Sequence, residues 1–164
     1  MAALSLALLA MSLAKPAPCG QFEQQKMLPG LSKPLVSPGR YGLRDGALVW
    51  HSLSPFESTL IIKGSGLYQQ LPGQEPVQLA SADNPLVASL ASLLPAVIQG
   101  DQAALETHFV VSQEAAGLRL VPKDALLKAA LEAIDVEGQP PALIRMLEPQ
   151  GGQTLIQLTP GTCQ

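Results

Sequence analysis

The dipeptide Asp45-Gly46, flanked on both sides by alternating apolar and polar residues, constrains the fold of this chain more than any other feature. Aspartate and glycine tolerate the positive φ angles of a two-residue hairpin turn, whose twist matches that of the strands it joins. A turn at these two residues predicts the cross-strand pairs Arg44 with Ala47, Leu43 with Leu48, Gly42 with Val49, Tyr41 with Trp50, and Arg40 with His51. A register shifted by one residue would put Leu43 and Trp50 on opposite faces, so the turn and the pattern agree.

Because side chains alternate between the two faces of a strand, this hairpin has one apolar face. We expect that face to carry Leu35, Ser37, Gly39, Tyr41, Leu43, Leu48 and Trp50. The other face takes Val36, Arg40, Arg44, Val49 and His51. The next segment, Ser58–Lys63, is rich in β-branched residues and predicts another strand, whose Leu60 and Ile62 we assign to the same apolar surface.

The composition favours a single domain with many short strands. The 164 residues include 15 prolines and 14 glycines, which are spread along the chain as regular turn punctuation. Only 14% of the residues are charged and 47% are hydrophobic, which excludes a disordered chain. A net charge of −3 without a basic cluster argues against a nucleic-acid partner.

The remaining chain predicts one helical insertion between two groups of strands. Gln21–Leu28 reads as a short helix that ends at Pro29-Gly30, and Asp101 is placed to cap a helical turn that runs to Glu106. A further helix from Asp124 changes to a strand within 131–136. We expect other strands at 67–70, 76–80, 109–113, 118–121, 142–148 and 153–158. The fold class is mainly β with α, an antiparallel sheet that is curled and covered on one face by helices.

The helical insertion begins at Asn84-Pro85, a pair suited to a helix cap and first turn. Its apolar residues recur at helical spacing, at Leu86, Leu90, Leu93, Leu94 and Val97. Pro95 interrupts this stripe, so we expect a break near Leu94 that leaves either two short helices or one kinked helix. The stripe is typical of ordinary core packing, and it also suits a lid over an apolar ligand.

Residues 2–14 form an uncharged apolar run in the position of a secretory signal. Small residues around Ala14 suit a signal peptidase, although the run has no preceding lysine or arginine. A buried N-terminal helix is the alternative. We interpret 1–14 as a signal peptide for export and 15–164 as the mature domain.

Two cysteines, Cys19 and Cys163, bracket that domain. In an oxidising compartment they could form a disulfide that closes nearly the whole chain into one loop, and two unpaired terminal thiols are the alternative. His51 and His108 have no ligand-type residues at metal-site spacing, so we predict no metal and no cofactor. The chain has no G-x-S-x-G, phosphate loop, dinucleotide fingerprint or paired-carboxylate motif. We therefore predict no catalytic residues and a binding protein rather than an enzyme, whose apolar face could hold acyl chains.

The order of residues along the mature chain resembles the LolA family of periplasmic outer-membrane lipoprotein carriers. The first half of the resemblance is carried by Phe22-x-x-Gln25, Leu31, Pro34-Leu35-x-Ser37-x-Gly39, Gly46-x-Leu48-x-Trp50 and Pro55. The second half, similar to a shorter and divergent branch, is carried by Gly100-Asp101, Leu105, Phe109, Leu118-x-Leu120-x-Pro122, Gly151 and Thr154-x-Ile156. The match extends from about residue 20 to residue 158.

The resemblance implies a half-open antiparallel β-barrel under a short helical lid. It also implies a monomer that shuttles acylated lipoprotein or lipid cargo from an inner-membrane release complex to an outer-membrane acceptor, without catalysis. The family's carriers use an arginine to latch the lid, for which Arg44, one residue out of register, and then Arg40 are the nearest candidates here. Two other functions stay open: a lipoprotein-sensing interaction domain of the same fold, and a small secreted hydrolase that uses His51 or His108.

Overall fold

The computed structural model describes residues 19–138 and 140–161. Eleven strands form one antiparallel sheet in the order β6-β5-β4-β3-β2-β1-β11-β10-β9-β8-β7. The strands are β1 (Cys19–Met27), β2 (Leu35–Arg44), β3 (Ala47–Ser52), β4 (Ser58–Lys63), β5 (Gly66–Gln70), β6 (Val77–Ser81), β7 (Phe109–Gln113), β8 (Gly117–Pro122), β9 (Ala133–Glu137), β10 (Leu143–Leu147) and β11 (Gln153–Gly161).

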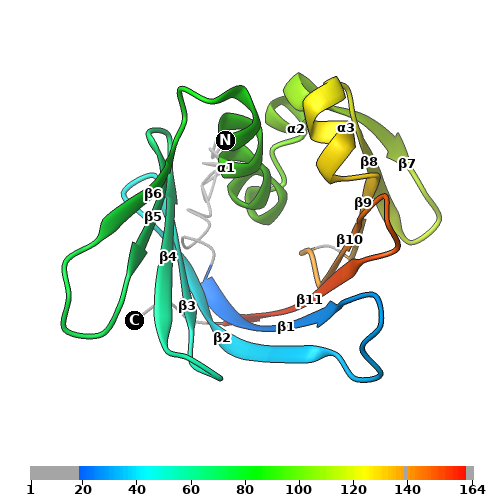
Figure 1. Ribbon diagram of the computed structural model, residues 1–164. Coiled ribbons are helices and arrows are strands. Elements are labelled where there is room, and N and C mark those ends of the chain that lie inside the picture. Colours follow the sequence, from blue (N-terminus) through cyan, green and yellow to red (C-terminus); the bar gives the residue numbers. More distant parts are fainter. Residues whose placement is uncertain (1–18, 139, 162–164) are drawn as a thin grey trace, which may run out of the picture.

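The sheet curls into a half-open barrel whose two edges, β6 and β7, stand apart. Figure 1 shows β3 to β6 as one wall, β1, β2 and β11 as the floor, and β8 to β10 as part of the opposite wall. Three helices lie on the open side: α1 (Pro85–Gln99), α2 (Gln102–His108) and α3 (Ala125–Ala130). The predicted fold class, a curled antiparallel sheet covered on one face by helices, is confirmed.

The hairpin predicted around Asp45-Gly46 is present with its predicted register. Each of the five pairs occurs between β2 and β3, from Arg44 opposite Ala47 to Arg40 opposite His51. Asp45 and Gly46 have φ angles of 50° and 77°, the positive values that a two-residue turn of this type requires.

The segment from Gln21 to Leu28 is not a helix, so this prediction is wrong. All of its residues except Leu28 belong to β1, the central strand of the sheet, which pairs with β2 on one side and β11 on the other. Glutamine, glutamate, lysine and methionine all favour helices in isolation. Pairing along both edges of β1 overrides that preference, and it buries Phe22 on one face of the sheet to 3% exposure.

The shorter helices begin at aspartate caps. The carboxylate of Asp101 accepts a hydrogen bond from the backbone N–H of Ala104, as predicted for this position. Asp124 accepts one from the N–H of Leu126 and starts α3, which ends just before β9. The change from helix to strand predicted within 131–136 is therefore confirmed.

Helix α1 is continuous through Pro95, so the alternative of two short helices is wrong and a single helix forms, while a kink at Pro95 stays a prediction. A proline inside a helix removes one backbone hydrogen bond. Burial on more than one side of α1 offsets this loss, since Leu93, Ala96 and Val97 are each at most 5% exposed. The helix contacts β3 to β6, α2 and α3, so it is packed between the sheet and the other helices.

Candidate functional site

The concave face of the sheet brings together most of the residues predicted to line an apolar cavity. Tyr41, Leu48, Trp50 and Ile62 belong to one buried cluster, in which none is more than 6% exposed. Leu43 and Leu60 are partly buried and pack against that cluster. Leu35 stands apart from the cluster, because it lies at the first position of β2 and is 54% exposed.

Phe22 is an aromatic residue of this face that the helix prediction for its segment had missed. Its ring stacks on Trp50 with centroids 3.7 Å apart and planes inclined by 16°. Gly39 is the cross-strand partner of Phe22, and the lack of a side chain there leaves space for the ring. Apolar and polar residues do not alternate in this segment, since Gln24 and Lys26 share the face of Phe22, so no local pattern identifies Phe22 as a residue of the concave face. Next to this stack, burial raises the pKa of the Tyr41 hydroxyl.

The predicted lid residues lie in α1, which covers the concave face. Leu93 and Val97 are 2% and 3% exposed, and Leu94 packs against the same cluster while partly buried. The side chains of Leu86 and Leu90 lie outside what the structure describes. Ala91, Ala96 and Ile98 are buried as well, so burial extends beyond the predicted stripe. The reason is that α1 is packed against helices as well as against the sheet.

A pocket of about 520 Å³ opens between the helices and the wall of β8 and β9. Its apolar walls come from Val97 of α1, Leu105 of α2, Leu118 of β8 and Val136 of β9. Gln102, Gln113 and Glu114 also line it and contribute polar groups. This volume lies in the range of small-ligand pockets. All four apolar side chains belong to the buried cluster or pack against it, so the apolar wall of the pocket is part of the core.

A larger depression, of about 740 Å³, lies on the convex face. Arg40, Arg44, His51 and Gln21 contribute polar groups to its lining, which does not suit an acyl chain. Arg40 and Arg44 were the candidates for a latch on the lid. Alternation along β2 directs both away from α1, because Tyr41, next to Arg40, and Leu43, next to Arg44, face the core.

Both histidines are hydrogen-bonded to hydroxyl groups. On the convex face, His51 Nδ1 lies 2.7 Å from Thr59 Oγ1 and His51 Nε2 lies 3.2 Å from Glu57 Oε1. This hydroxyl, imidazole and carboxylate stand in the order of a catalytic triad. However, His51 and Thr59 are direct cross-strand partners, so the contacts also join β3 to β4. His108 Nδ1 lies 3.1 Å from the hydroxyl of buried Ser89, which ties α2 to α1.

Cys19 is disulfide-bonded. Its cross-strand partner is Gly161 of β11, which precedes Cys163 by two residues. Cys163 itself lies outside the described residues, as does the predicted signal peptide. In the described ranges, no group of histidine, cysteine, aspartate and glutamate side chains is arranged to hold a metal. Nor does any described helix have the length and apolarity to cross a membrane.

Comparison with known proteins places the chain in a family. Residues 2–161 match the profile described as outer membrane lipoprotein carrier protein LolA-like. Among curated proteins, the comparison finds no match. Among solved structures, the crystal structure of a LolA superfamily protein from Nitrosomonas europaea is similar at a TM-score of 0.48 and 10% identity, over 89% of this chain and 85% of that one. A similarity at this TM-score carries no weight in assigning the family. Since the profile spans nearly the whole sequence, the chain belongs to the LolA-like family of outer membrane lipoprotein carrier proteins.

Proposed function

We propose that this protein binds the acyl chains of a lipoprotein or related lipid in its apolar interior and carries them through the periplasm toward the outer membrane. The observation that supports this most directly is the 520 Å³ pocket, whose apolar wall is formed by residues of the core or packed against it. The LolA-like family supports the carrier role. In this proposal residues 1–14 direct export, and a donor in the inner membrane and an acceptor in the outer membrane exchange the cargo.

Binding requires no covalent step by the protein. Each methylene that leaves water for an apolar site contributes about 0.8 kcal/mol, so a few buried methylenes give useful affinity. Release requires that the interior open again. Helix α1 is the element suited to this movement, because it covers the concave face and Pro95 leaves it one backbone hydrogen bond short.

Trp50 allows a direct test, because it is the only tryptophan in the chain and lies on the concave face, 5% exposed. We would titrate the purified protein with dibrominated stearic acid, whose bromines quench tryptophan fluorescence on close approach. Saturable quenching is expected. Unbrominated fatty acids of increasing length should displace the probe with an affinity that rises by up to about fourfold per methylene until the site is full.

A pair of leucine variants locates the site. Leu118→Gln puts an amide into the wall of the pocket and should weaken binding about tenfold, since a buried amide without a partner costs about 1–3 kcal/mol. Leu126→Gln makes the same change at a side chain that is 61% exposed on α3, and it should leave binding unchanged. Absence of quenching in the unmodified protein would refute the carrier proposal. Equal effects of the two variants would refute this location.

A further inference from the structure

The concave face carries a single charged side chain among the strand residues that the structure describes. Lys26 of β1 lies opposite Leu35 of β2 and Thr154 of β11. Phe22, four residues earlier on the same strand, is in the buried cluster. Since residues separated by an even number share a face, Lys26 belongs to the concave face with Phe22.

The other charged residues of the described strands lie on the convex face. The same alternation, counted from buried neighbours, places there Glu23, Arg40, Arg44, His51, Lys63, Arg119, Asp135, Glu137 and Arg145. Several of them are paired on that face, such as Arg119 with Asp135 and Arg145 with Glu137. Lys26 thus differs from every other charged strand residue in the direction of its side chain.

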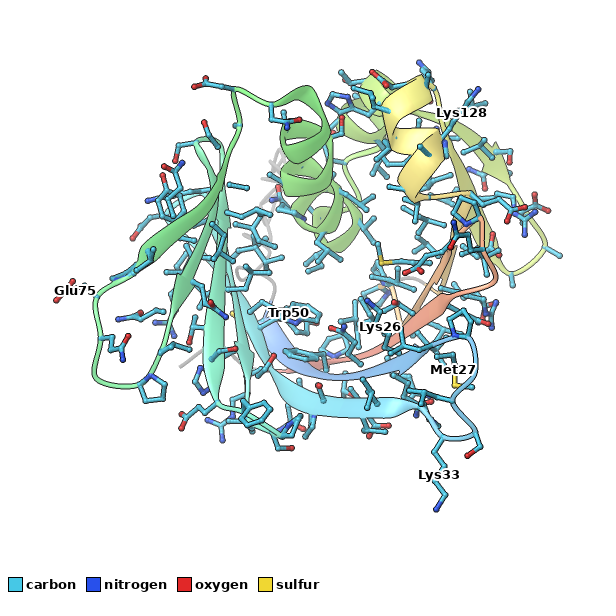
Figure 2. The ribbon with its side chains drawn as sticks, in the orientation of Figure 1. Lys26, Met27, Lys33, Trp50, Glu75 and Lys128 are labelled. Atoms are coloured by element: carbon cyan, nitrogen blue, oxygen red, sulfur yellow. The ribbon has the colours of Figure 1, made fainter. Side chains whose placement is uncertain are left out.

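The surroundings of Lys26 can bind a polar group. Its neighbours on the concave face are Gln24 on its own strand, Ser37 opposite Gln24, and the buried Thr154. Figure 2 shows the side chain of Lys26 directed into the space that the sheet encloses, on the same side of the floor as Trp50, whereas Lys33 points outward from a loop. Within the described ranges, Lys26 forms no ion pair or side-chain hydrogen bond.

Lys26 is half-buried, and an anion bound to its ammonium group replaces the hydration that burial of the side chain removes. A fatty ligand in the interior brings its polar end to the edge of the apolar region. We propose that Lys26, with Gln24, Ser37 and Thr154 beside it, binds the anionic head of an acylated ligand, a carboxylate or a phosphate. This proposal rests on the proposed function and narrows its cargo to lipids with a negative head near the acyl chains.

The experiment compares three ligands with the same dibrominated stearoyl chain: the free acid, the lysophosphatidic acid and the uncharged methyl ester. Each is titrated against the unmodified protein, Lys26→Met, Lys26→Arg and Lys33→Met, with quenching of Trp50 as the signal. Methionine keeps most of the length of the lysine side chain and removes its charge. Lys33→Met is the matched control, because it removes a lysine that lies in a loop and points away from the interior.

We expect Lys26→Met to weaken binding of one or both anionic ligands about tenfold, the usual worth of a hydrogen bond to a charged group, and to leave the ester unchanged. The anion that is affected more identifies the head group. Lys26→Arg should retain binding, and Lys33→Met should change nothing. If Lys26→Met weakens acid and ester equally, or affects neither anion, the head-group site is refuted while the carrier function stands. If the unmodified protein binds none of the three, both proposals are refuted.

Discussion

Replacing Gly39 by alanine tests the packing beneath the proposed binding surface. An alanine Cβ at this position would lie 2.6 Å from Phe22 Cε1, and closer still to Phe22 Cζ and to the carbonyl oxygen of His51. Ordinary van der Waals contacts of a Cβ begin near 3.4 Å. The ring of Phe22 would therefore move by roughly 1 Å, and its stacking on Trp50 at 3.7 Å leaves it little room.

Two costs add up in Gly39→Ala. Forcing an extra carbon into a close-packed core costs about 1–3 kcal/mol, and disturbing an aromatic pair costs about 0.5–1.5 kcal/mol. We expect the free energy of unfolding to fall by about 2–4 kcal/mol. The matched control is Gly42→Ala on the same strand, where the added Cβ would meet only the side chain of Cys19, with Sγ at 3.3 Å. That variant should differ from the unmodified protein by less than about 1 kcal/mol.

The assay is equilibrium urea unfolding under oxidising conditions, followed by the fluorescence of Trp50, with near-ultraviolet circular dichroism to report on the aromatic stack. Gly39→Ala should lower the midpoint and reduce the aromatic signal in the folded state. If Gly39→Ala and Gly42→Ala unfold at the same urea concentration with equal aromatic signals, Phe22 is not held over Gly39. The arrangement of the concave face described above would then be wrong.

Two further predictions concern the convex face and the chain ends. The hydrogen bond from Arg119 is the main cause that holds the pKa of the Asp135 carboxyl below its usual 3.8, against the opposing effect of its burial. Asp135→Asn should therefore lower the melting temperature at pH 7, and the difference should disappear as the pH falls through that lowered pKa; a constant difference down to pH 2 would contradict this. We also expect Cys19 to pair with Cys163, so a reductant should destabilise the oxidised protein by about 4–5 kcal/mol and leave Cys19→Ser unaffected. Peptide mapping without reduction identifies the partner.

Local signals were sufficient for the hairpin of β2 and β3. The Asp45-Gly46 turn and the alternation around it determine the register without help from the rest of the chain, and every predicted pair is present. The same reasoning failed for β1, where Glu23, Gln25 and Lys26 favour a helix locally. Only the strands on either side of β1, one of them from the far end of the chain, determine its conformation. No pattern within nine residues contains that information.

Helix α1 illustrates a second limit of local patterns. The leucine stripe correctly indicated a helix, and Pro95 correctly marked a missing hydrogen bond. Whether the helix breaks there depends on how much burial its C-terminal turn gains, and Ala96, Val97 and Ile98 are all buried. That burial depends on α2 and on the sheet wall, which a stripe of residues cannot specify. The same limit applies to the site residues. The local hairpin pattern predicted the position of Trp50, whereas no local pattern predicted the position of Phe22.

The distribution of charge across the sheet connects the fold to its proposed role. The convex face holds cross-strand ion pairs, Arg119 with Asp135 and Arg145 with Glu137, as expected for a surface in contact with water. The concave face keeps its charged groups to Lys26 alone among the described strands, at the end of β1 beside Leu35 and Thr154. In an interior that served only as a filled core, a lysine on the central strand would lose part of its hydration and no bound anion would compensate for that loss. An interior that receives a fatty anion gains both an apolar wall and an anchor for the polar head.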